Sequence, residues 1–270
     1  MERPGLVASD VDGTLLDPTE RISGRTRAAV HRVIAAGVPF VLVTGRPPRW
    51  IPPVVEQLGH AGPAVCANGA VLYDAATDRV RHAVTLDPQQ LRSAADAVSF
   101  ALPGARLAVE LPAGRARVNG FDQFLAEPDY THPWPGADSE VAPREVLLAR
   151  PAIKMLVRLP DASSDAMAVA IRQILGTELD VTFSTGHGLI ELSAPGVTKG
   201  TGLAQVAAEL GVAAVDVLAF GDMPNDLPML RWAGWGVAMA NAHHAVLGAA
   251  DEITAPNSED GLALVLERWF

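Results

Sequence analysis

The sequence predicts an α/β fold, in which a doubly wound, mostly parallel, Rossmann-like sheet carries an inserted α+β cap domain. Two patterns lead to this prediction. Toward both ends of the chain, short and nearly continuous apolar runs alternate with segments of helical periodicity, as in strands that are buried on both faces of a parallel sheet. Between residues 83 and 186 a helix is followed by alternating strands, and this unit repeats with little sign of parallel crossovers.

The elements follow in order along the chain. We assign residues 1–82 and 187–270 to a catalytic core and residues 83–186 to a substrate-selecting cap. In the core we predict strands at 6–9, 38–43, 64–67, 215–220, 235–239 and 252–254, and helices at 23–36, 200–210 and 262–269. In the cap we predict helices at 88–101 and 163–175, and strands at 106–111, 115–118, 153–159, 180–184 and 189–192. Gly37 and Gly211 stand where the first two core helices should stop.

The composition is that of an ordinary globular protein, with 49% hydrophobic and 19% charged residues. A formal charge of −10 works against non-specific attraction to nucleic acid or to anionic membrane surfaces, so we expect neither as a partner. We find no secretory signal and no apolar run near the roughly 18 residues of a membrane span, and therefore expect a cytoplasmic protein. The single cysteine, Cys66, excludes an internal disulfide and a cysteine-rich zinc site.

Two carboxylates stand at the end of the first predicted strand. Asp10 and Asp12 are two residues apart at its carboxyl end, where ligands of open α/β sheets bind. Gly13 permits a sharp turn whose amide groups can point toward an anion. Taken alone, such a pair is as compatible with a solvated turn as with a metal site.

Polar residues at three further positions in the core each have two possible interpretations. Thr44 follows the second predicted strand and either donates to a phosphoryl oxygen or caps the next segment. Lys199 is either a charge beside the amide end of a helix or a surface residue. Asp222, Asn225 and Asp226 follow a buried strand, where they offer hard oxygen ligands for magnesium or merely turn and cap a short helix.

The order of these motifs resembles the haloacid dehalogenase superfamily. The matching segments are Asp10-Val11-Asp12-Gly13-Thr14, Thr44-Gly45-Arg46, Lys199 and Gly221-Asp222-Met223-Pro224-Asn225-Asp226. Within that superfamily, Asn68-Gly69, the run Gly196-Val197-Thr198-Lys199-Gly200 and the large insert resemble the Cof-type phosphatases with an α/β cap. The resemblance implies a magnesium-dependent phosphomonoester hydrolase that acts through an aspartyl phosphate. Its implied substrate is a small phosphorylated metabolite, either a sugar phosphate or a phosphorylated cofactor.

The resemblance also implies a role for each residue. Asp10 would be the nucleophile, Asp12 the general acid and base, and Thr44 and Lys199 the holders of the phosphoryl group. Mg²⁺ would be bound by Asp10, the backbone carbonyl of Asp12 and Asp222, with Asn225 and Asp226 in or next to its water shell. The expected substrate contacts are Thr44, Gly45, Arg46, Asn68, Gly69 and Lys199. Met223-Pro224 departs from the small or polar residues that relatives often carry, but it leaves the spacing of the metal residues unchanged.

Physical chemistry agrees with these roles, because a phosphoryl group in transfer spreads negative charge over its oxygens and needs positioned positive charge. Asp12 must be protonated when an alkoxide leaves, and this requires burial or neighbouring anions. Arg46 either contacts the substrate or pairs with an acidic helix nearby. His132, Trp134 and His187 are candidates for the substrate face of the cap.

Three alternatives remain open at this stage. A phosphomutase would use the same aspartyl phosphate but return the phosphoryl group to a sugar. A nucleotide-sugar transferase would use Asp10-Val11-Asp12 as its metal motif and would leave Thr44, Lys199 and Asp222 unexplained. A non-catalytic binding protein of the same fold would not need the full set of catalytic residue types. The sequence leaves the oligomeric state open.

Overall fold

The fold is taken from a computed structural model of the chain, which describes residues 2–116, 123–134 and 139–270. The chain forms two compact units: Met1–His82 with Thr198–Phe270, called here the core unit, and Ala83–Val197, called here the insert unit. Each unit has its own sheet.

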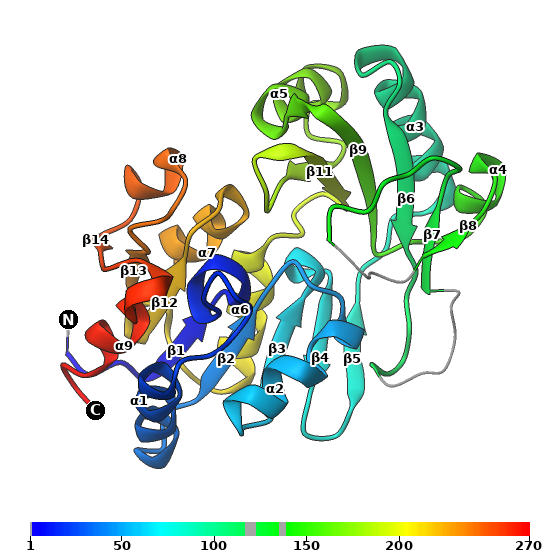
Figure 1. The fold of residues 1–270 in the computed structure, drawn as a ribbon. Helices are drawn as coiled ribbons and strands as arrows, with labels where there is room; N and C mark the ends of the chain where they lie inside the picture. The colour runs from blue at the N-terminus through cyan, green and yellow to red at the C-terminus, as the bar shows by residue number, and fades with distance from the viewer. Residues whose placement is uncertain (1, 117–122, 135–138) are drawn as a thin grey trace. The chain divides into compact units, whose positions relative to one another are not determined.

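The core unit is built on an eight-stranded sheet in the order β14-β13-β12-β1-β2-β3-β4-β5 (Figure 1). All pairs from β14 to β3 are parallel, and β4 is antiparallel to β3. The strands are β1 (Leu6–Ser9), β2 (Phe40–Val43), β3 (Pro63–Cys66), β4 (Val71–Asp74), β5 (Arg79–Ala83), β12 (Val217–Gly221), β13 (Trp235–Ala238) and β14 (Glu252–Ile253). The predicted fold class is therefore confirmed.

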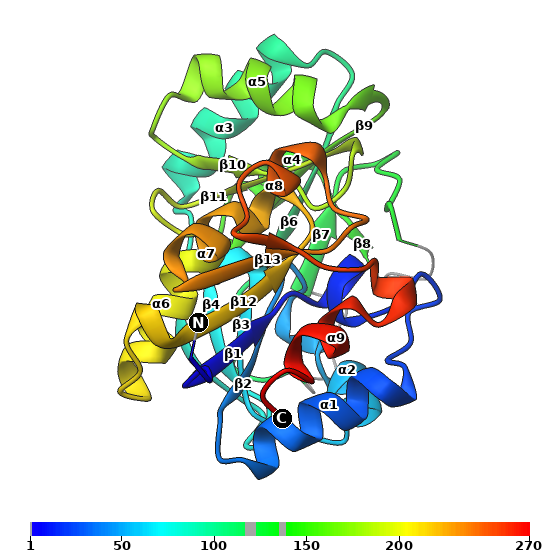
Figure 2. The same cartoon turned by 90° about the vertical axis from the view of Figure 1, so that its left-hand side faces the viewer.

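Helices cover both faces of this sheet. They are α1 (Gly24–Ala35), α2 (Pro52–Leu58), α6 (Lys199–Glu209), α7 (Leu227–Trp232), α8 (His244–Leu247) and α9 (Gly261–Leu266). Helix α1 packs against α9 and α6 packs against α7, and Figure 2 shows these pairs on opposite faces of the sheet. Every residue of β1, β2 and β12 is buried, as expected for central strands between two helical layers.

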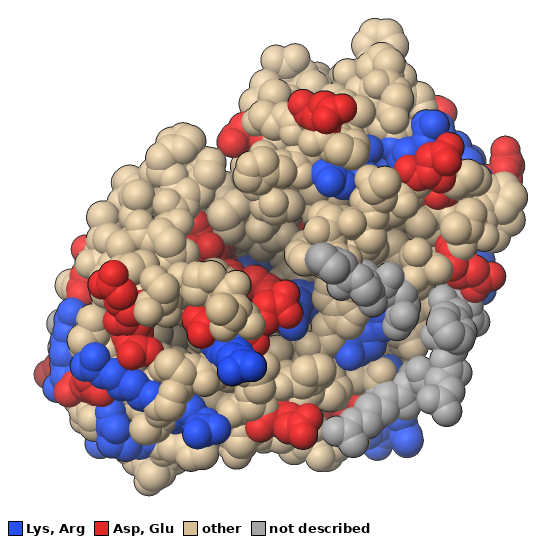
Figure 3. All heavy atoms as spheres, viewed as in Figure 1, with Lys and Arg blue, Asp and Glu red and all other residues tan. Residues whose placement is uncertain are grey.

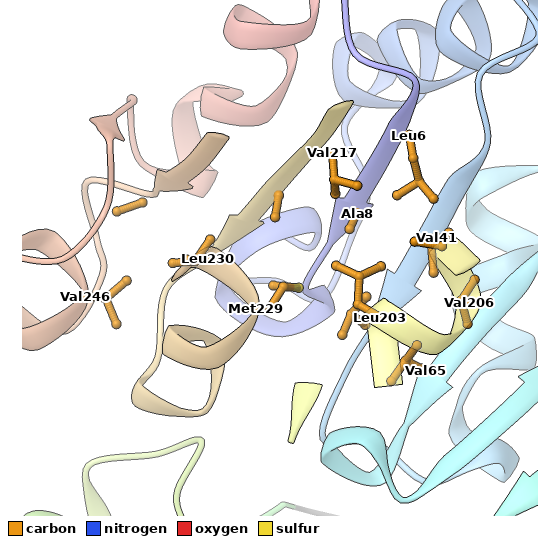
Figure 4. Close-up of a cluster of buried hydrophobic side chains, with 14 of the residues drawn as sticks. Leu6, Ala8, Val41, Val65, Leu203, Val206, Val217, Met229, Leu230 and Val246 are labelled. Atoms are coloured by element: carbon orange, nitrogen blue, oxygen red, sulfur yellow. The ribbon is translucent and has the colours of Figure 1, made fainter. Parts of the chain in front are cut away.

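The main apolar core lies between the sheet and the layer of α6 and α7. Figure 4 shows Leu6 and Ala8 of β1, Val41 of β2, and Leu203 and Val206 of α6 turned toward one another. Helix α6 begins at a capped end, because the Thr198 hydroxyl accepts from the Thr201 amide at 3.1 Å. This packing fixes the amino terminus of α6 against the carboxyl ends of the strands.

The insert unit contains a six-stranded sheet in the order β10-β11-β9-β6-β7-β8. Its neighbouring strands are antiparallel except for the parallel pair β7 and β8. The elements are α3 (Pro88–Ala101), β6 (Arg106–Glu110), β7 (Phe124–Ala126), β8 (Glu140–Val141), α4 (Arg144–Leu147), β9 (Lys154–Ser163), α5 (Ser164–Leu175), β10 (Asp180–Thr182) and β11 (His187–Ser193). Helix α3 starts with a capping box formed by Asp87 and Gln90.

The second predicted domain boundary, after Gly186, is wrong. Strand β11 pairs with β9 and β10, so the insert unit extends to Val197. The apolar pattern of this strand is local and says nothing about which sheet it joins. The strand predicted at 115–118 lies partly outside the described residues, and its described residues, Arg115 and Ala116, are not in a strand.

The surface carries both signs of charge. Figure 3 shows acidic and basic side chains interspersed on the face in view. Some form ion pairs, such as Arg25 Nη2 with Glu267 Oε2 at 2.6 Å. Within the part of the chain that the structure describes, no helix has the length and apolarity needed to cross a membrane.

Candidate active site

The core sheet brings the predicted catalytic residues to one edge. Asp10 follows β1, Asp222 follows the adjacent strand β12, and Thr44 follows β2 on the other side of β1. The chain winds away from β1 in opposite directions through β2 and β12, and such a switch point leaves a crevice at the carboxyl ends of the strands. Lys199, the first residue of α6, reaches the same place.

Lys199 is buried between two carboxylates. Its side chain is 1% exposed, and its Nζ donates to Asp10 Oδ1 and to Asp226 Oδ1, each at 2.6 Å. Hydrogen bonds in which both groups are charged belong to the strong class. The alternative that Lys199 is a surface charge is therefore wrong.

Burial and charge together shift the pKa values of this cluster. Burial raises the pKa of Asp10 to about 7, although Lys199 lowers it, and Asp226 raises it further. Burial, with the negative charges of Asp10 and Asp226, also raises the pKa of Asp222 well above its usual range. Burial would lower the pKa of Lys199, but the two carboxylates outweigh burial and raise it. One ammonium group therefore does not offset the cost of burying Asp10 and Asp222 in their charged forms.

A tight turn after β1 places Asp222. Asp222 Oδ1 accepts from the Thr14 hydroxyl at 3.2 Å. Gly13 has a φ of +79°, and a Cβ on it would stand 2.2 Å from Asp222 Oδ2. Only glycine allows both this left-handed conformation and this close approach.

Asp226 supports its neighbours with both carboxylate oxygens. Oδ1 holds Lys199, and Oδ2 accepts from the backbone amides of Asp222 and Met223, each at 2.9 Å. The side chain is fully buried. Asp226 therefore stabilises the turn after β12, which is the structural role that the sequence left open for it. It also links Lys199 to Asp222 through hydrogen bonds.

A second turn, after β3, supports the same edge. Asn68 has a φ of +56°, and its Oδ1 accepts from Asn225 Nδ2 at 3.0 Å. Asn225 Oδ1 is buried, and none of the described residues donates to it. A Cβ on Gly69 would stand 2.1 Å from the carbonyl oxygen of Thr198, so the turn packs directly on the start of α6.

Asp12 and Arg46 form an ion pair. Arg46 Nε and Nη2 donate to the two carboxylate oxygens of Asp12 at 2.8 and 2.5 Å. Of the two expected ways to keep Asp12 protonated, burial does not apply, because its side chain is 49% exposed, whereas that of Arg46 is 17% exposed. Burial lowers the pKa of Arg46, but the Asp12 carboxylate outweighs this and raises it. Arg46 thus pairs with a residue of the predicted catalytic motif rather than with an acidic helix.

Thr44 orients the start of this loop. Its hydroxyl accepts from the Arg46 amide at 3.0 Å, and its side chain is fully buried. None of the described residues accepts the hydroxyl proton of Thr44, which leaves that proton for a ligand. Gly45 passes close to Asn68, since a Cβ on Gly45 would lie 3.1 Å from Asn68 Oδ1.

The acidic residues fit a metal ion. Carboxylate oxygens of Asp10, Asp222 and Asp226 all lie within 4.8 Å of one another. Hard oxygen ligands of this kind suit Mg²⁺ or Ca²⁺. A divalent cation would relieve the repulsion between the carboxylates, which adds to burial in raising the pKa values of Asp10 and Asp222. The buried Asn225 Oδ1 is a further acceptor without a donor among the described residues.

Sequence reasoning gave no role to two residues that hold the site. Thr14 donates to Asp222, and Asn241 Nδ2 donates to the carbonyl oxygen of Gly13 at 2.9 Å. Thr14 is the last residue of the segment Asp10-Val11-Asp12-Gly13-Thr14, so its place in that motif could have predicted a role at the site. Asn241 stands in a turn after β13 and carries no sequence pattern that points to Gly13.

Comparison with known proteins decides the family. Residues 7–266 match the family model described as haloacid dehalogenase-like hydrolase. The chain belongs to this family. The solved structure of a haloacid dehalogenase-like hydrolase from Bacteroides thetaiotaomicron superposes with a TM-score of 0.76 and 25% identity, covering 98% of this chain and 99% of that one.

Two curated relatives of this haloacid dehalogenase-like hydrolase are phosphatases by name. The 5-amino-6-(5-phospho-D-ribitylamino)uracil phosphatase YcsE of Bacillus subtilis is 29% identical over 266 residues, which cover 98% of this chain and 95% of that protein. The pyridoxal phosphate phosphatase YbhA of Escherichia coli is 27% identical over 285 residues, which cover 96% of each chain. The predicted resemblance is confirmed.

Proposed function

We propose that this chain is a phosphomonoester hydrolase, which transfers the phosphoryl group of a small metabolite first to Asp10 and then to water. The observation that carries this proposal is the buried cluster in which Lys199 bridges Asp10 and Asp226 at 2.6 Å, with Asp222 beside them. A positioned ammonium group beside a carboxylate nucleophile is what phosphoryl transfer requires, because the reaction depends on charge stabilisation. The phosphatase names of the two relatives support the reaction class.

In the first step, Asp10 attacks phosphorus while Lys199 holds its Oδ1. A bond forms between an Asp10 oxygen and phosphorus, the ester bond between phosphorus and oxygen breaks, and the leaving oxygen takes a proton from Asp12. Lys199 and the hydroxyl proton of Thr44 stabilise the charge on the phosphoryl oxygens. Asp12 has to leave its pair with Arg46 to carry the proton, so Arg46 becomes available to the substrate at the same moment.

In the second step, water attacks the phosphorus of the aspartyl phosphate. Asp12 takes the proton of that water, the bond between phosphorus and the Asp10 oxygen breaks, and inorganic phosphate leaves. The Asp10 carboxylate is restored. Both steps use the same two aspartates, so the active site needs no further acid or base.

Magnesium is the metal that this donor set suits. We assign Asp10, Asp222 and the backbone carbonyl of Asp12 as its ligands, with Asn225 next to its water shell. When bound, the ion supplies positive charge that offsets the repulsion between the Asp10 carboxylate and the phosphate of the substrate. Asp226 acts behind these ligands, since both of its oxygens already bind protein groups.

The test is phosphate release from nitrophenyl phosphate and from a panel of phosphorylated metabolites, with Mg²⁺ and with excess chelator. Asp10→Asn should abolish turnover, and mass spectrometry should find the phosphoryl group on Asp10 in the intact protein. Asp216→Asn is the matched control, because Asp216 is an exposed aspartate of the same unit. Full activity in chelator would refute the metal assignment, and a phosphorylated residue other than Asp10 would refute the nucleophile.

A further inference from the structure

The turn after β1, residues 11–15 and called here the motif turn, is bound from outside by two asparagines that lie far along the chain. Asn241, in the loop after β13, donates from Nδ2 to the carbonyl oxygen of Gly13 at 2.9 Å. Asn257, in the segment after β14, donates from Nδ2 to the carbonyl oxygen of Leu16 at 2.7 Å. The two side-chain amides therefore bind the motif turn at its middle and directly after its end.

The two asparagines also bind each other. The backbone amide of Asn257 donates to Asn241 Oδ1 at 2.9 Å. Because Oδ1 accepts this bond, Nδ2 is the atom that faces the carbonyl oxygen of Gly13, and the orientation of the Asn241 amide group is fixed. An aspartate at position 241 would have the same size but would lack the donor. Asn241 therefore links the segment after β14 to the motif turn.

The motif turn contains the residue type that restrains its own backbone least. Asp12 and Gly13 are not helical, with a ψ of 122° and a φ of +79° respectively. Gly13 has to be glycine beside Asp222, but glycine also has the widest conformational freedom. A hydrogen bond to the carbonyl oxygen of Gly13 fixes the plane of the next peptide, and with it the direction from which Thr14 donates to Asp222. The asparagines therefore supply a restraint that glycine cannot.

The loop that carries Asn241 also binds the segment of Asp222. The backbone amide of His243 donates to the backbone carbonyl oxygen of Asp222 at 2.8 Å. The backbone amide of Met239 donates to the carbonyl oxygen of Gly221 at 3.1 Å. The same loop thus bonds to both segments that carry the proposed metal ligands, so it sets how far the motif turn lies from Asp222.

Asn257 belongs to a segment that is itself held in place. The Thr254 hydroxyl donates to the carbonyl oxygen of Gly261 at 2.8 Å, which closes the segment on itself. Asp260 Oδ1 accepts from the hydroxyl of Thr26 in α1 at 3.1 Å, which ties the segment to that helix. A loose segment could not restrain the motif turn, whereas this one is bonded on both sides of Asn257.

We propose that Asn241 and Asn257 are positioning residues for phosphoryl transfer, which hold the motif turn, and with it Asp10 and Asp12, at a fixed distance from Asp222. The inference rests on the proposed phosphatase function, because it names what keeps that site in shape. The two asparagines act through the backbone of the turn. Their loss should therefore slow turnover and weaken Mg²⁺ binding, because small displacements of reacting groups are costly, while substrate binding changes little.

The experiment measures kcat and KM for nitrophenyl phosphate in saturating Mg²⁺, and measures Mg²⁺ binding without substrate by titration calorimetry. Asn241→Ala removes two hydrogen bonds and Asn257→Ala removes one. We expect kcat to fall about tenfold or more for the first and about fivefold for the second, with KM within about twofold. The Kd for Mg²⁺ should rise by similar factors. The double variant should lose less than the product of the single effects, because both asparagines act on one turn.

Ser258→Ala is the matched control, because Ser258 is the exposed neighbour of Asn257. It should leave kcat, KM and the Kd for Mg²⁺ unchanged. All proteins are assayed below their unfolding transitions, followed by circular dichroism, so a loss of stability alone would leave kcat and Mg²⁺ binding at the wild-type values. Asn257→Ala removes only one bond, so it still decides the question if Asn241→Ala does not fold.

The outcomes separate this inference from the proposed function. If the wild type hydrolyses neither nitrophenyl phosphate nor the phosphorylated metabolites, the phosphatase proposal fails, and calorimetry still decides the positioning role: weaker Mg²⁺ binding in the variants supports it, and equal or absent binding refutes it. If the wild type is active but both asparagine variants keep its kcat and its Mg²⁺ affinity, positioning is refuted and the phosphatase proposal stands. A raised KM with an unchanged kcat would also refute positioning, since it would indicate a contact with the substrate.

Discussion

Asp226→Asn tests whether the buried cluster is held together as the geometry implies. The substitution keeps the size of the side chain and replaces one acceptor oxygen by an NH₂ donor. In the wild type, one oxygen faces the Lys199 ammonium and the other faces two backbone amides. Either orientation of the new amide therefore points a donor at a donor, and the charge of Lys199 loses one of its two partners.

We expect a large loss in the free energy of unfolding, because both side chains are buried and water cannot replace the lost hydrogen bond. Asp226 is 0% exposed and Lys199 is 1% exposed. Breaking a buried ion pair from one side costs about 3–5 kcal/mol. We take the low end of this range, about 3 kcal/mol, since Asp10 still pairs with Lys199 and since the substitution removes one negative charge that repels Asp10 and Asp222. For a unit of this size, that corresponds to a fall in Tm of roughly 6 °C or more.

The assay is thermal unfolding followed by circular dichroism, with kcat on nitrophenyl phosphate measured on the same samples. Asp216→Asn makes the same chemical change at an exposed position and should shift stability by less than about 0.5 kcal/mol. The turnover of Asp226→Asn should also fall, because Lys199 loses its position. A Tm equal to that of the control would refute the anchoring role of Asp226.

Three further predictions concern the same edge of the sheet. Gly69→Ala should lower the free energy of unfolding by about 2 kcal/mol or more, because the new Cβ would clash with the Thr198 carbonyl at a position of positive φ. Gly104→Ala is the control, since Gly104 also has a positive φ, +88°, but has open space around it, so this substitution brings backbone strain without the clash. Equal losses of stability for the two variants in urea unfolding would contradict the predicted clash. The pKa of Asp10 is about 7 in the folded protein against its ordinary value of 3.8, so folding favours the protonated form, and metal-free stability should fall as the pH rises from that ordinary value through 7. Mg²⁺ should therefore raise Tm more at pH 8 than at pH 5, and an Asp10→Asn protein that keeps this difference would argue against this role of Asp10. Asp12→Ala should slow the first step about 10²–10⁴-fold more for a sugar phosphate than for nitrophenyl phosphate, because only the alkoxide leaving group of the sugar needs a proton. Single-turnover kinetics measures this step, and equal slowing for both substrates would show that Asp12 does not transfer the proton.

The sequence by itself determined the core fold and the edge at which the site lies. Continuous apolar runs identified β1, β2 and β12, and parallel strands present their carboxyl ends on one edge. Asp10, Thr44 and Asp222 follow those strands directly, so their shared location followed from local pattern. The family resemblance added Lys199, whose position at the start of a helix had not distinguished it from a surface charge.

Only the tertiary structure decided which side chains meet. Hydrophobic periodicity reports the face that a residue occupies, but it carries no information about partners that are distant in sequence. The bonds of Lys199 to Asp226 and of Asn68 to Asn225 are of this kind. So is the pair of Asp12 and Arg46, in which the Asp12 side chain is half exposed. For the same reason the domain boundary after Gly186 was wrong: the alternation at 189–192 predicts a strand, but only the hydrogen bonds of β11 to β9 and β10 fix the sheet that this strand joins.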